Sequence, residues 1–196
     1  MREIPSDVSQ RHLLDLLTSH VSDDEVALVN QAYSLAESAH AGQVRDEGAP
    51  YIVHPLRVAI SLVDELSIYS PTLVTSALLH DVIEDSSITR EQIGDMFGDE
   101  VARIVWLLTK LEDVSLGAYL AAIEAASETG APLVKLCDRL DNLRGLSRSP
   151  KADKKRRYIF TTEQFYLPLA RRTNSYLYDE MCHWLDRARE HVESLK

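Results

Sequence analysis

Residues 78–85 read LLHDVIED, and this stretch decides how the rest of the chain is interpreted. Behind two leucines it carries four ionisable groups, those of His80, Asp81, Glu84 and Asp85. Burying an unpaired charge against apolar residues is costly, so a purely structural helix would keep such groups off its apolar stripe. On a helix, His80 and Glu84 share one face while Asp81 and Asp85 share the adjoining face. We therefore expect other parts of the chain to supply partners for these side chains.

The overall composition is that of an ordinary globular protein. With 196 residues, 45% of them hydrophobic and 27% charged, the chain can form one domain with a sizeable core. A net charge of −10 argues against general affinity for nucleic acid or anionic membranes. The two cysteines have no spacing typical of disulfide or zinc frameworks, and no apolar run resembles a signal peptide or membrane span. We therefore expect a cytoplasmic protein with no membrane or nucleic-acid partner.

Helical signals recur along nearly the whole chain. Ser22 with Glu25, and Thr89 with Gln92, have the spacing of a capping box. Prolines stand near the expected starts of three further helices, at Pro55, Pro71 and Pro132. Pro168 is expected to bend or interrupt a helix that spans about residues 156–172. These signals predict an all-α, single-domain helical bundle over residues 1–196, with about eight to ten helices.

The ionisable groups of residues 80–85 favour a metal site. A neutral imidazole beside a carboxylate is a good ligand pair for a divalent ion, but one helix cannot complete a coordination shell. Further candidates are His54, before Pro55 at a helix start, and Asp138, which emerges from an apolar stripe and needs a partner. Each residue taken singly is more often a cap or a core hydrogen-bonding group than a ligand. Together, two imidazoles and two carboxylates would leave room for water and a phosphate oxygen.

Several segments then occur in an order that resembles one known family. They are AHAGQVRDEGAPYIVHPLRVA, ALLHDVIEDSSIT, MFGDEVARIVWLLTKL, VKLCDRLDNLRGL and YLPLARR, between about residues 39 and 172. This pattern resembles the hydrolase domain of the Rel/Spo alarmone enzymes, part of the HD phosphohydrolase superfamily. Because the chain is too short to add the synthetase domain of that family, it is most similar to the stand-alone small alarmone hydrolases.

The resemblance implies a function and a set of site residues. It implies an enzyme that removes the 3′-pyrophosphate of guanosine tetra- or pentaphosphate, releasing pyrophosphate and GDP or GTP, with bound Mn²⁺, for which Zn²⁺ or Co²⁺ could substitute. The implied metal ligands are His54, His80, Asp81 and Asp138. Glu84 and Asp85 match the acidic pair that activates water. Arg45 matches the arginine that packs on the base, and Asn142 matches a residue that contacts the nucleoside.

A basic stretch provides candidates for binding the substrate phosphates. Residues 144–157 contain seven Lys or Arg and one acid, a local reversal of charge in an acidic chain. A basic surface formed by these residues would attract an anionic substrate, although most of the Lys and Arg side chains are expected to be simply solvated. We single out Arg157, which matches a phosphate-binding arginine of the family, and Lys110 as a weaker candidate.

Four positions depart from the family pattern. Asp46 stands where lysine is common, Asp141 where an uncharged residue is usual, Gly145 where threonine is frequent, and Arg171 where histidine is expected. The Asp141 carboxylate could accept a hydrogen bond from the amino group of guanine or of adenine. We therefore expect altered base selectivity, with adenosine alarmones as additional substrates.

Two alternatives to alarmone hydrolysis stay open at this point. One is an HD-class phosphohydrolase of another nucleotide, such as a nucleoside monophosphate, a deoxynucleoside triphosphate or NADPH. The other is a catalytically inactive nucleotide-binding module. A toxic alarmone synthetase would be a functional partner, acting through the shared nucleotide rather than by contact, and a homo-oligomer is compatible with the sequence.

Overall fold

The computed structural model describes residues 8–146, 149 and 151–193. These residues form helices and loops without a β-sheet, so the expected all-α fold is confirmed. The described chain divides into two compact units. The first unit contains the described residues up to Gln43 together with Pro50–Thr109, and the second contains Val44–Ala49 and the described residues from Lys110 onward. The expectation of a single domain stays a prediction.

The helices of the first unit begin where the sequence provides caps. In chain order they are α1 (Gln10–Leu17), α2 (Asp23–Ala39), α3 (Val53–Ile60), the π-helical turn η1 (Ser61–Glu65), α4 (Pro71–Leu79), α5 (Val82–Asp85), α6 (Arg90–Phe97) and α7 (Asp99–Leu108). Both predicted capping boxes are confirmed, Ser22 with Glu25 at α2 and Thr89 with Gln92 at α6. Pro71 is the first residue of α4, where its missing N–H costs no hydrogen bond.

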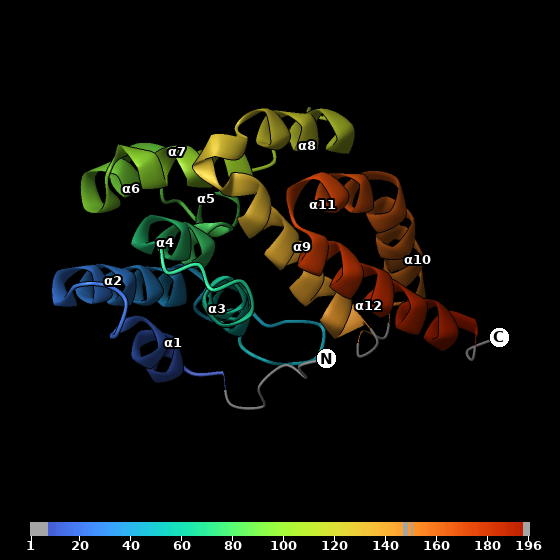
Figure 1. The fold of residues 1–196 in the computed structure, drawn as a ribbon, viewed down its shortest axis with the longest axis horizontal. Coiled ribbons are helices and arrows are strands. Elements are labelled where there is room, and N and C mark those ends of the chain that lie inside the picture. Colours follow the sequence, from blue (N-terminus) through green and yellow to red (C-terminus); the bar gives the residue numbers. More distant parts are fainter. Residues whose placement is uncertain (1–7, 147–148, 150, 194–196) are drawn as a thin grey trace. The chain divides into compact units, whose positions relative to one another are not determined.

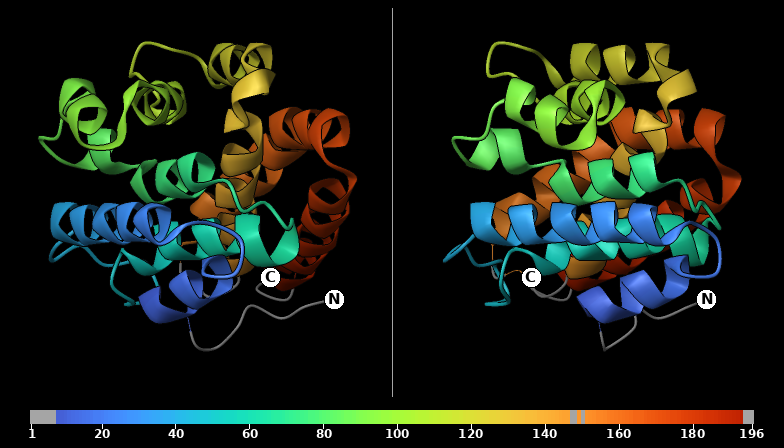
Figure 2. Two further views of the ribbon diagram at one scale, coloured as in Figure 1. Left: turned by 60° about the vertical axis from the view of Figure 1, so that its left-hand side comes forward. Right: turned by 90° about the vertical axis from the view of Figure 1, so that its left-hand side faces the viewer.

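Helix α4 forms the centre of the first unit. It packs against α2, α3 and α7, and residues 74–79 are all buried. Figures 1 and 2 show α2 and α4 side by side, with α1 packed along α2. Each fully buried aliphatic side chain of this kind contributes about 1.5–3 kcal/mol to the free energy of unfolding. The end of α4, where the LLHD sequence lies, is therefore held by a well-packed helix.

The second unit is built around a long buried helix. Its elements are α8 (Leu116–Ala125), the 3₁₀ turn η2 (Ser127–Thr129), α9 (Ala131–Leu146), α10 (Ala152–Thr161), the π-helical turn η3 (Thr162–Tyr166), α11 (Leu167–Thr173) and α12 (Ser175–Glu193). Helix α9 packs against α12, and α12 also packs against α10 and α11 (Figure 1). Most side chains of α9 are buried, which includes the charged residues Asp138, Arg139, Asp141 and Arg144.

The predicted interruption at Pro168 is confirmed and takes a specific form. Proline cannot donate the hydrogen bond that an α-helix requires, and its ring crowds the preceding turn. Here η3 widens the helix to π geometry over residues 162–166, and α11 then resumes with Pro168 in its first turn. This change of pitch lets α10 and α11 follow one another without a loop.

Arg139 joins α9 to this bent segment. Its guanidinium lies between the rings of Tyr158 and Tyr166, 4.2 and 4.3 Å from their centroids. Its Nε donates to Thr162 Oγ1 at 2.8 Å and its Nη2 donates to the carbonyl of Tyr158 at 2.9 Å. Burial lowers the pKa of Arg139, but the two rings and these acceptors compensate a charge that would otherwise be costly to bury.

Candidate metal centre

The helix that the sequence predicts through residues 78–85 is broken at His80 and Asp81. Helix α4 ends at Leu79 and α5 begins at Val82, with φ −100° and ψ −5° at Asp81. The expectation of a continuous helix through residues 78–85 is therefore corrected.

Three ligand candidates converge in the first unit. The Nε2 atom of His80 lies 3.2 Å from Oδ2 of Asp81, and Nε2 of His54 lies 3.8 Å from the same oxygen. One ligand atom from each of the three residues lies within 4.8 Å of those of the other two. Both histidines are buried, and their rings meet edge to face at 5.2 Å. Segments 26 residues apart in sequence thus supply one cluster.

The chemistry of this donor set fits a divalent cation. The Nδ1 atom of His80 lies 2.8 Å from the carbonyl oxygen of Ala77, which can only accept, so Nδ1 carries the proton. The lone pair of Nε2 then faces the carboxylate oxygen of Asp81. Two lone-pair donors at this distance repel unless a cation lies between them, and a backbone carbonyl that fixes the tautomer is typical of metal-ligating histidines. Imidazole nitrogen with carboxylate oxygen suits Mn²⁺, Zn²⁺ or Co²⁺.

The two acids proposed for water activation lie on α5, and Asp85 is close enough to the cluster to interact with Asp81 and His80. The side chain of Asp85 is 38% exposed, and Glu84 is also exposed. Partial burial and the nearby carboxylate of Asp81 raise the pKa of Asp85 above its ordinary value, while His40, His80 and Tyr51 act in the opposite direction. A carboxylate with a raised pKa that stays accessible to water is suited to accept a proton.

Sequence reasoning missed three residues that lie near Asp85 and Asp81, namely His40, Gln43 and Tyr51. His40 is the C-cap of α2, buried to 3% exposure, with Nδ1 3.9 Å from Oδ2 of Asp85. Gln43 lies between them, and Tyr51 donates its hydroxyl to Oδ2 of Asp81 at 2.7 Å. The signal was present in the sequence as a histidine at the end of an amphipathic helix and a tyrosine three residues before His54.

The fourth predicted ligand, Asp138, lies in the second unit on α9. It is 7% exposed. Its Oδ1 accepts a hydrogen bond from Nδ2 of Asn142 at 2.6 Å, and its Oδ2 lies 2.9 Å from Nζ of Lys135. The aspartate therefore has the polar partners that its apolar sequence context required.

Arg45 and Asn142, predicted to hold the nucleoside, contact each other in the second unit. Nη2 of Arg45 donates to Oδ1 of Asn142 at 3.2 Å and lies 3.7 Å from Oδ2 of Asp141. Its Nε lies 3.8 Å from Oε1 of Glu47. A Cβ atom added to Gly145 would lie 3.9 Å from Nη2 of Arg45, so two of the positions that depart from the family pattern border this arginine.

Part of the basic stretch is neutralised by Asp46. Its carboxylate accepts hydrogen bonds from Lys151 at 2.8 Å, Lys154 at 2.7 Å and the hydroxyl of Ser149 at 2.9 Å. The two lysines are the largest causes of a pKa of Asp46 well below its ordinary value. This pairing accounts locally for the acid that stands where the family has lysine.

Two predicted phosphate-binding residues lie in different surroundings of the second unit. Arg157 is exposed on α10, whereas Nζ of Lys110 donates to the backbone carbonyl of Leu111 at 3.3 Å. Their assignment to phosphate binding stays a prediction.

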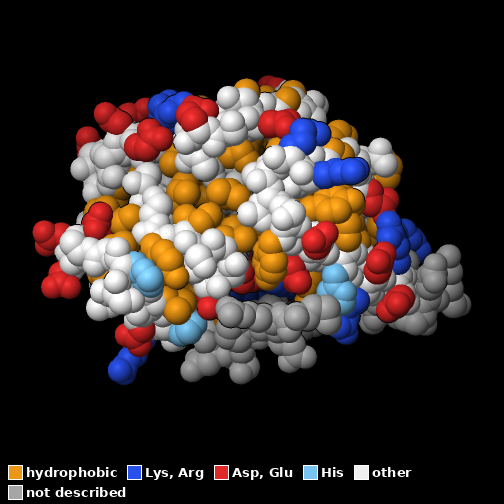
Figure 3. All heavy atoms as spheres, in the orientation of Figure 1, with side chains coloured by type: hydrophobic (Ala, Val, Ile, Leu, Met, Phe, Trp, Pro, Cys, Tyr) orange, Lys and Arg blue, Asp and Glu red, His pale blue; other side chains and the backbone are white. Residues whose placement is uncertain are grey.

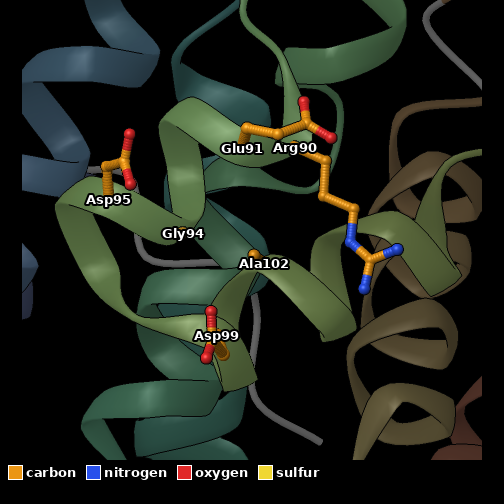
Figure 4. Close-up of a pocket in the computed structure, with 6 residues that line it drawn as sticks. All are labelled: Arg90, Glu91, Gly94, Asp95, Asp99 and Ala102. Atoms are coloured by element: carbon orange, nitrogen blue, oxygen red, sulfur yellow. The ribbon is translucent and has the colours of Figure 1, made fainter.

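A separate hollow of about 360 Å³ lies between α6 and the start of α7. Acidic side chains gather over these helices (Figure 3), and Figure 4 shows Glu91, Asp95 and Asp99 around the hollow, pointing in different directions. Within the described residues, the cluster of convergent metal-ligand atoms is that of His54, His80 and Asp81, and these three acids do not belong to it.

Comparison with known proteins agrees with this geometry. The family model described as HD domain matches residues 32–175. The chain belongs to the HD domain family. The expected HD-domain architecture is therefore confirmed, and His80 and Asp81 lie within the matched residues.

Relatives of this HD domain are proteins of alarmone metabolism. The bifunctional (p)ppGpp synthase/hydrolase SpoT of Escherichia coli K12 is 36% identical over 169 residues, 82% of this chain and 24% of that protein. A GTP pyrophosphokinase of Myxococcus xanthus is 36% identical over 180 residues, 86% of this chain and 22% of that protein. The chain thus spans about a quarter of the length of these relatives.

A solved structure shares the fold over nearly its whole length. It is a metazoan ortholog of SpoT, described as hydrolysing ppGpp and acting in starvation responses. The TM-score is 0.71 at 25% identity, and the alignment covers 82% of this chain and 95% of that one. Among the helices that the structure describes here, none combines the length and apolar character needed to cross a bilayer.

Proposed function

We propose that this HD domain hydrolyses the 3′-pyrophosphate of guanosine tetra- and pentaphosphate, yielding pyrophosphate and GDP or GTP. The observation that carries the proposal is the convergence of His54, His80 and Asp81 beside the accessible carboxylate of Asp85. The names of the relatives support the same substrate class, since several are guanosine-3′,5′-bis(diphosphate) 3′-pyrophosphohydrolases.

The metal ligands and the acids have separate roles in this proposal. We propose Mn²⁺ as the ion, with Asp138 as a fourth ligand on the strength of its LCDRL sequence. A bound divalent ion would offset phosphate charge and lower the pKa of water. Glu84 and Asp85 orient the attacking water and accept its proton. The water oxygen bonds to the phosphorus attached to the 3′ oxygen as the bond from that phosphorus to the 3′ oxygen breaks. The proton that the acids accepted passes to the 3′ oxygen, so pyrophosphate and a nucleotide with a free 3′-hydroxyl are released.

Arg45 and Asn142 are proposed to hold the nucleoside, with Arg157 and Lys110 contacting phosphates. The guanidinium of Arg45 can stack on a purine while Asn142 keeps its orientation through the 3.2 Å hydrogen bond. The buried carboxylate of Asp141 lies 3.7 Å from the same guanidinium and introduces an acceptor near the proposed base site. This supports our proposal that adenosine alarmones are also substrates.

The cellular setting follows from the same chemistry. Cys137 and Cys182 form no disulfide among the described residues, which agrees with the reducing, cytoplasmic location that we propose. The place in the stringent response is proposed from the substrate class alone. A toxic alarmone synthetase would be a partner through the shared nucleotide.

The test is a product assay on metal-depleted protein. The chain is incubated with guanosine and adenosine 3′-pyrophosphates, with and without Mn²⁺, and products are separated by anion exchange. We expect Mn²⁺-dependent release of pyrophosphate, reduced at least about 100-fold in Glu84→Gln. Asp95→Gln, an exposed acid on α6, serves as the matched control and should retain full activity.

Two outcomes would replace the proposal. Release of orthophosphate or triphosphate from another nucleotide, with no reaction of any purine 3′-pyrophosphate, would identify a different HD-class phosphohydrolase. Tight binding of alarmones with no turnover under any metal would identify a nucleotide-binding module.

A further inference from the structure

We infer that His40 is a positioning residue that holds Asp85 in the orientation needed to accept a proton from water. The inference rests on the proposed function, because it assigns to Asp85 the role of activating water. His40 is not one of the three residues whose ligand atoms converge, so it acts on the acid rather than on the metal.

The backbone delivers His40 to this place in a fixed way. As C-cap of α2, its N–H bonds to the carbonyl of Ala36, which ends a helix of 17 residues packed against α4. The side chain of His40 is fully buried, whereas that of Asp85 is 38% exposed. A rigid buried ring thus lies behind an acid that must remain open to water.

The amide of Gln43 fixes the proton of His40. Its Nε2 donates to the backbone carbonyl of Asp85 at 3.4 Å, so its Oε1 is the atom that lies 3.0 Å from Nδ1 of His40. Since this oxygen can only accept, Nδ1 carries the hydrogen. The same Nδ1 lies 3.9 Å from Oδ2 of Asp85, so the N–H dipole attracts the carboxylate from that side.

Tyr51 connects this arrangement to the metal candidates. Its ring packs on that of His40 with 4.6 Å between centroids, and its N–H donates to the carbonyl of Gln43. Its hydroxyl donates to Oδ2 of Asp81 at 2.7 Å. Tyr51 therefore contacts both His40 and Asp81, while His40 and Gln43 lie against Asp85. A displacement of about 1 Å in the acid that activates water is sufficient to slow a reaction about 100-fold.

A purely structural role would not favour histidine at this position. Nε2 of His40 is buried and has no hydrogen-bond partner among the described residues. An unsatisfied buried polar atom costs about 1–3 kcal/mol, which a phenylalanine packed on Tyr51 would avoid. The imidazole is therefore explained by what Nδ1 does for Asp85.

Three variants separate positioning from packing. The amide nitrogen of asparagine can occupy the place of Nδ1, whereas glutamine places it near Nε2 and phenylalanine keeps only the ring. We expect His40→Asn to retain kcat within about 3-fold, and His40→Gln and His40→Phe to lose about 10-fold or more with KM unchanged. If packing alone matters, the order reverses and His40→Phe is the most active, which would overturn the inference.

Controls keep this test distinct from that of the proposed function. His20, which stacks on Tyr69 at 3.5 Å in the same unit, receives the same three substitutions and should leave kcat unchanged. Affinity for Mn²⁺ should be unaffected in every His40 variant. An inactive wild-type chain would refute the proposed function alone. Crystal structures then decide the inference: Asp85 should keep its rotamer in His40→Asn and lose it in His40→Phe, and an unchanged rotamer in both refutes it.

Discussion

Replacing Asp81 with asparagine should abolish stabilisation of the protein by Mn²⁺. Asparagine has the same shape and keeps an oxygen that can accept the hydrogen bond from Tyr51, which is 2.7 Å from Oδ2 in the native chain. It removes the negative charge that faces Nε2 of both His80 and His54. The variant should therefore fold normally without metal and fail mainly in binding the ion.

The expected size follows from mass action. Mn²⁺ at 100 times its Kd adds about 2.7 kcal/mol to the free energy of unfolding, which for a chain of this size raises Tm by about 5–10 °C. If the loss of charge weakens binding about 100-fold, the same concentration equals the new Kd. The remaining stabilisation is then about 0.4 kcal/mol, or roughly 1 °C.

The assay is a thermal melt of protein freed of metal with EDTA and titrated with Mn²⁺, so it needs no substrate. Asp95→Asn is the matched control, because Asp95 belongs to the acidic surface around the hollow between α6 and α7 (Figure 4). We expect it to keep the full Mn²⁺-induced shift. A full shift in Asp81→Asn, or an equal loss in Asp95→Asn, would refute a metal centre at His54, His80 and Asp81.

Three further changes test the second unit. Asp46→Asn should lower the free energy of unfolding by about 1 kcal/mol at pH 7, as measured by urea titration. Because the pKa of Asp46 is depressed in the folded protein, the difference in stability between the variant and the native chain should shrink below about pH 4. Arg139→Lys should lower the free energy of unfolding by about 2–4 kcal/mol in the same titration, because lysine loses the buried guanidinium stacking on Tyr158 and the hydrogen bond to Thr162. An unchanged free energy of unfolding would contradict a stabilising role of this guanidinium. Gly145→Ala should stabilise α9 by about 0.5–1 kcal/mol, because the added Cβ atom has room beside Arg45. Destabilisation would show that the space between residue 145 and Arg45 is too small for a methyl group.

Local sequence rules predicted most of the helical framework. Capping residues such as Ser22 and Thr89 act within a few residues of themselves, so their spacing specifies a helix start whatever packs on it later. Proline likewise acts on its own turn, and the π-helical turn before Pro168 is the expected disturbance in its specific form. These features depend on short-range sterics and hydrogen bonds, which a sequence displays directly.

The break at His80 and Asp81 could not be predicted in this way. Both residues have αR or near-αR backbone angles, and nothing in LLHDVIED stops a helix as glycine or proline would. The break follows the buried half of α4, residues 74–79, and the two side chains lie close to His54, a residue from another helix. Such long-range convergence overrides local propensity, which is common at functional sites.

Charged residues that depart from the family pattern also show that a local sequence does not reveal long-range contacts. In the sequence, Asp46 is one of the departures from the family pattern, and it directly follows Arg45. In the structure its carboxylate is held by Lys151 and Lys154, residues more than 100 positions away in the chain. Asp141, by contrast, lies 3.7 Å from Arg45. Of these two acids, Asp141 is therefore the one that would act directly on the base selectivity that we propose, whereas Asp46 is held by Lys151 and Lys154.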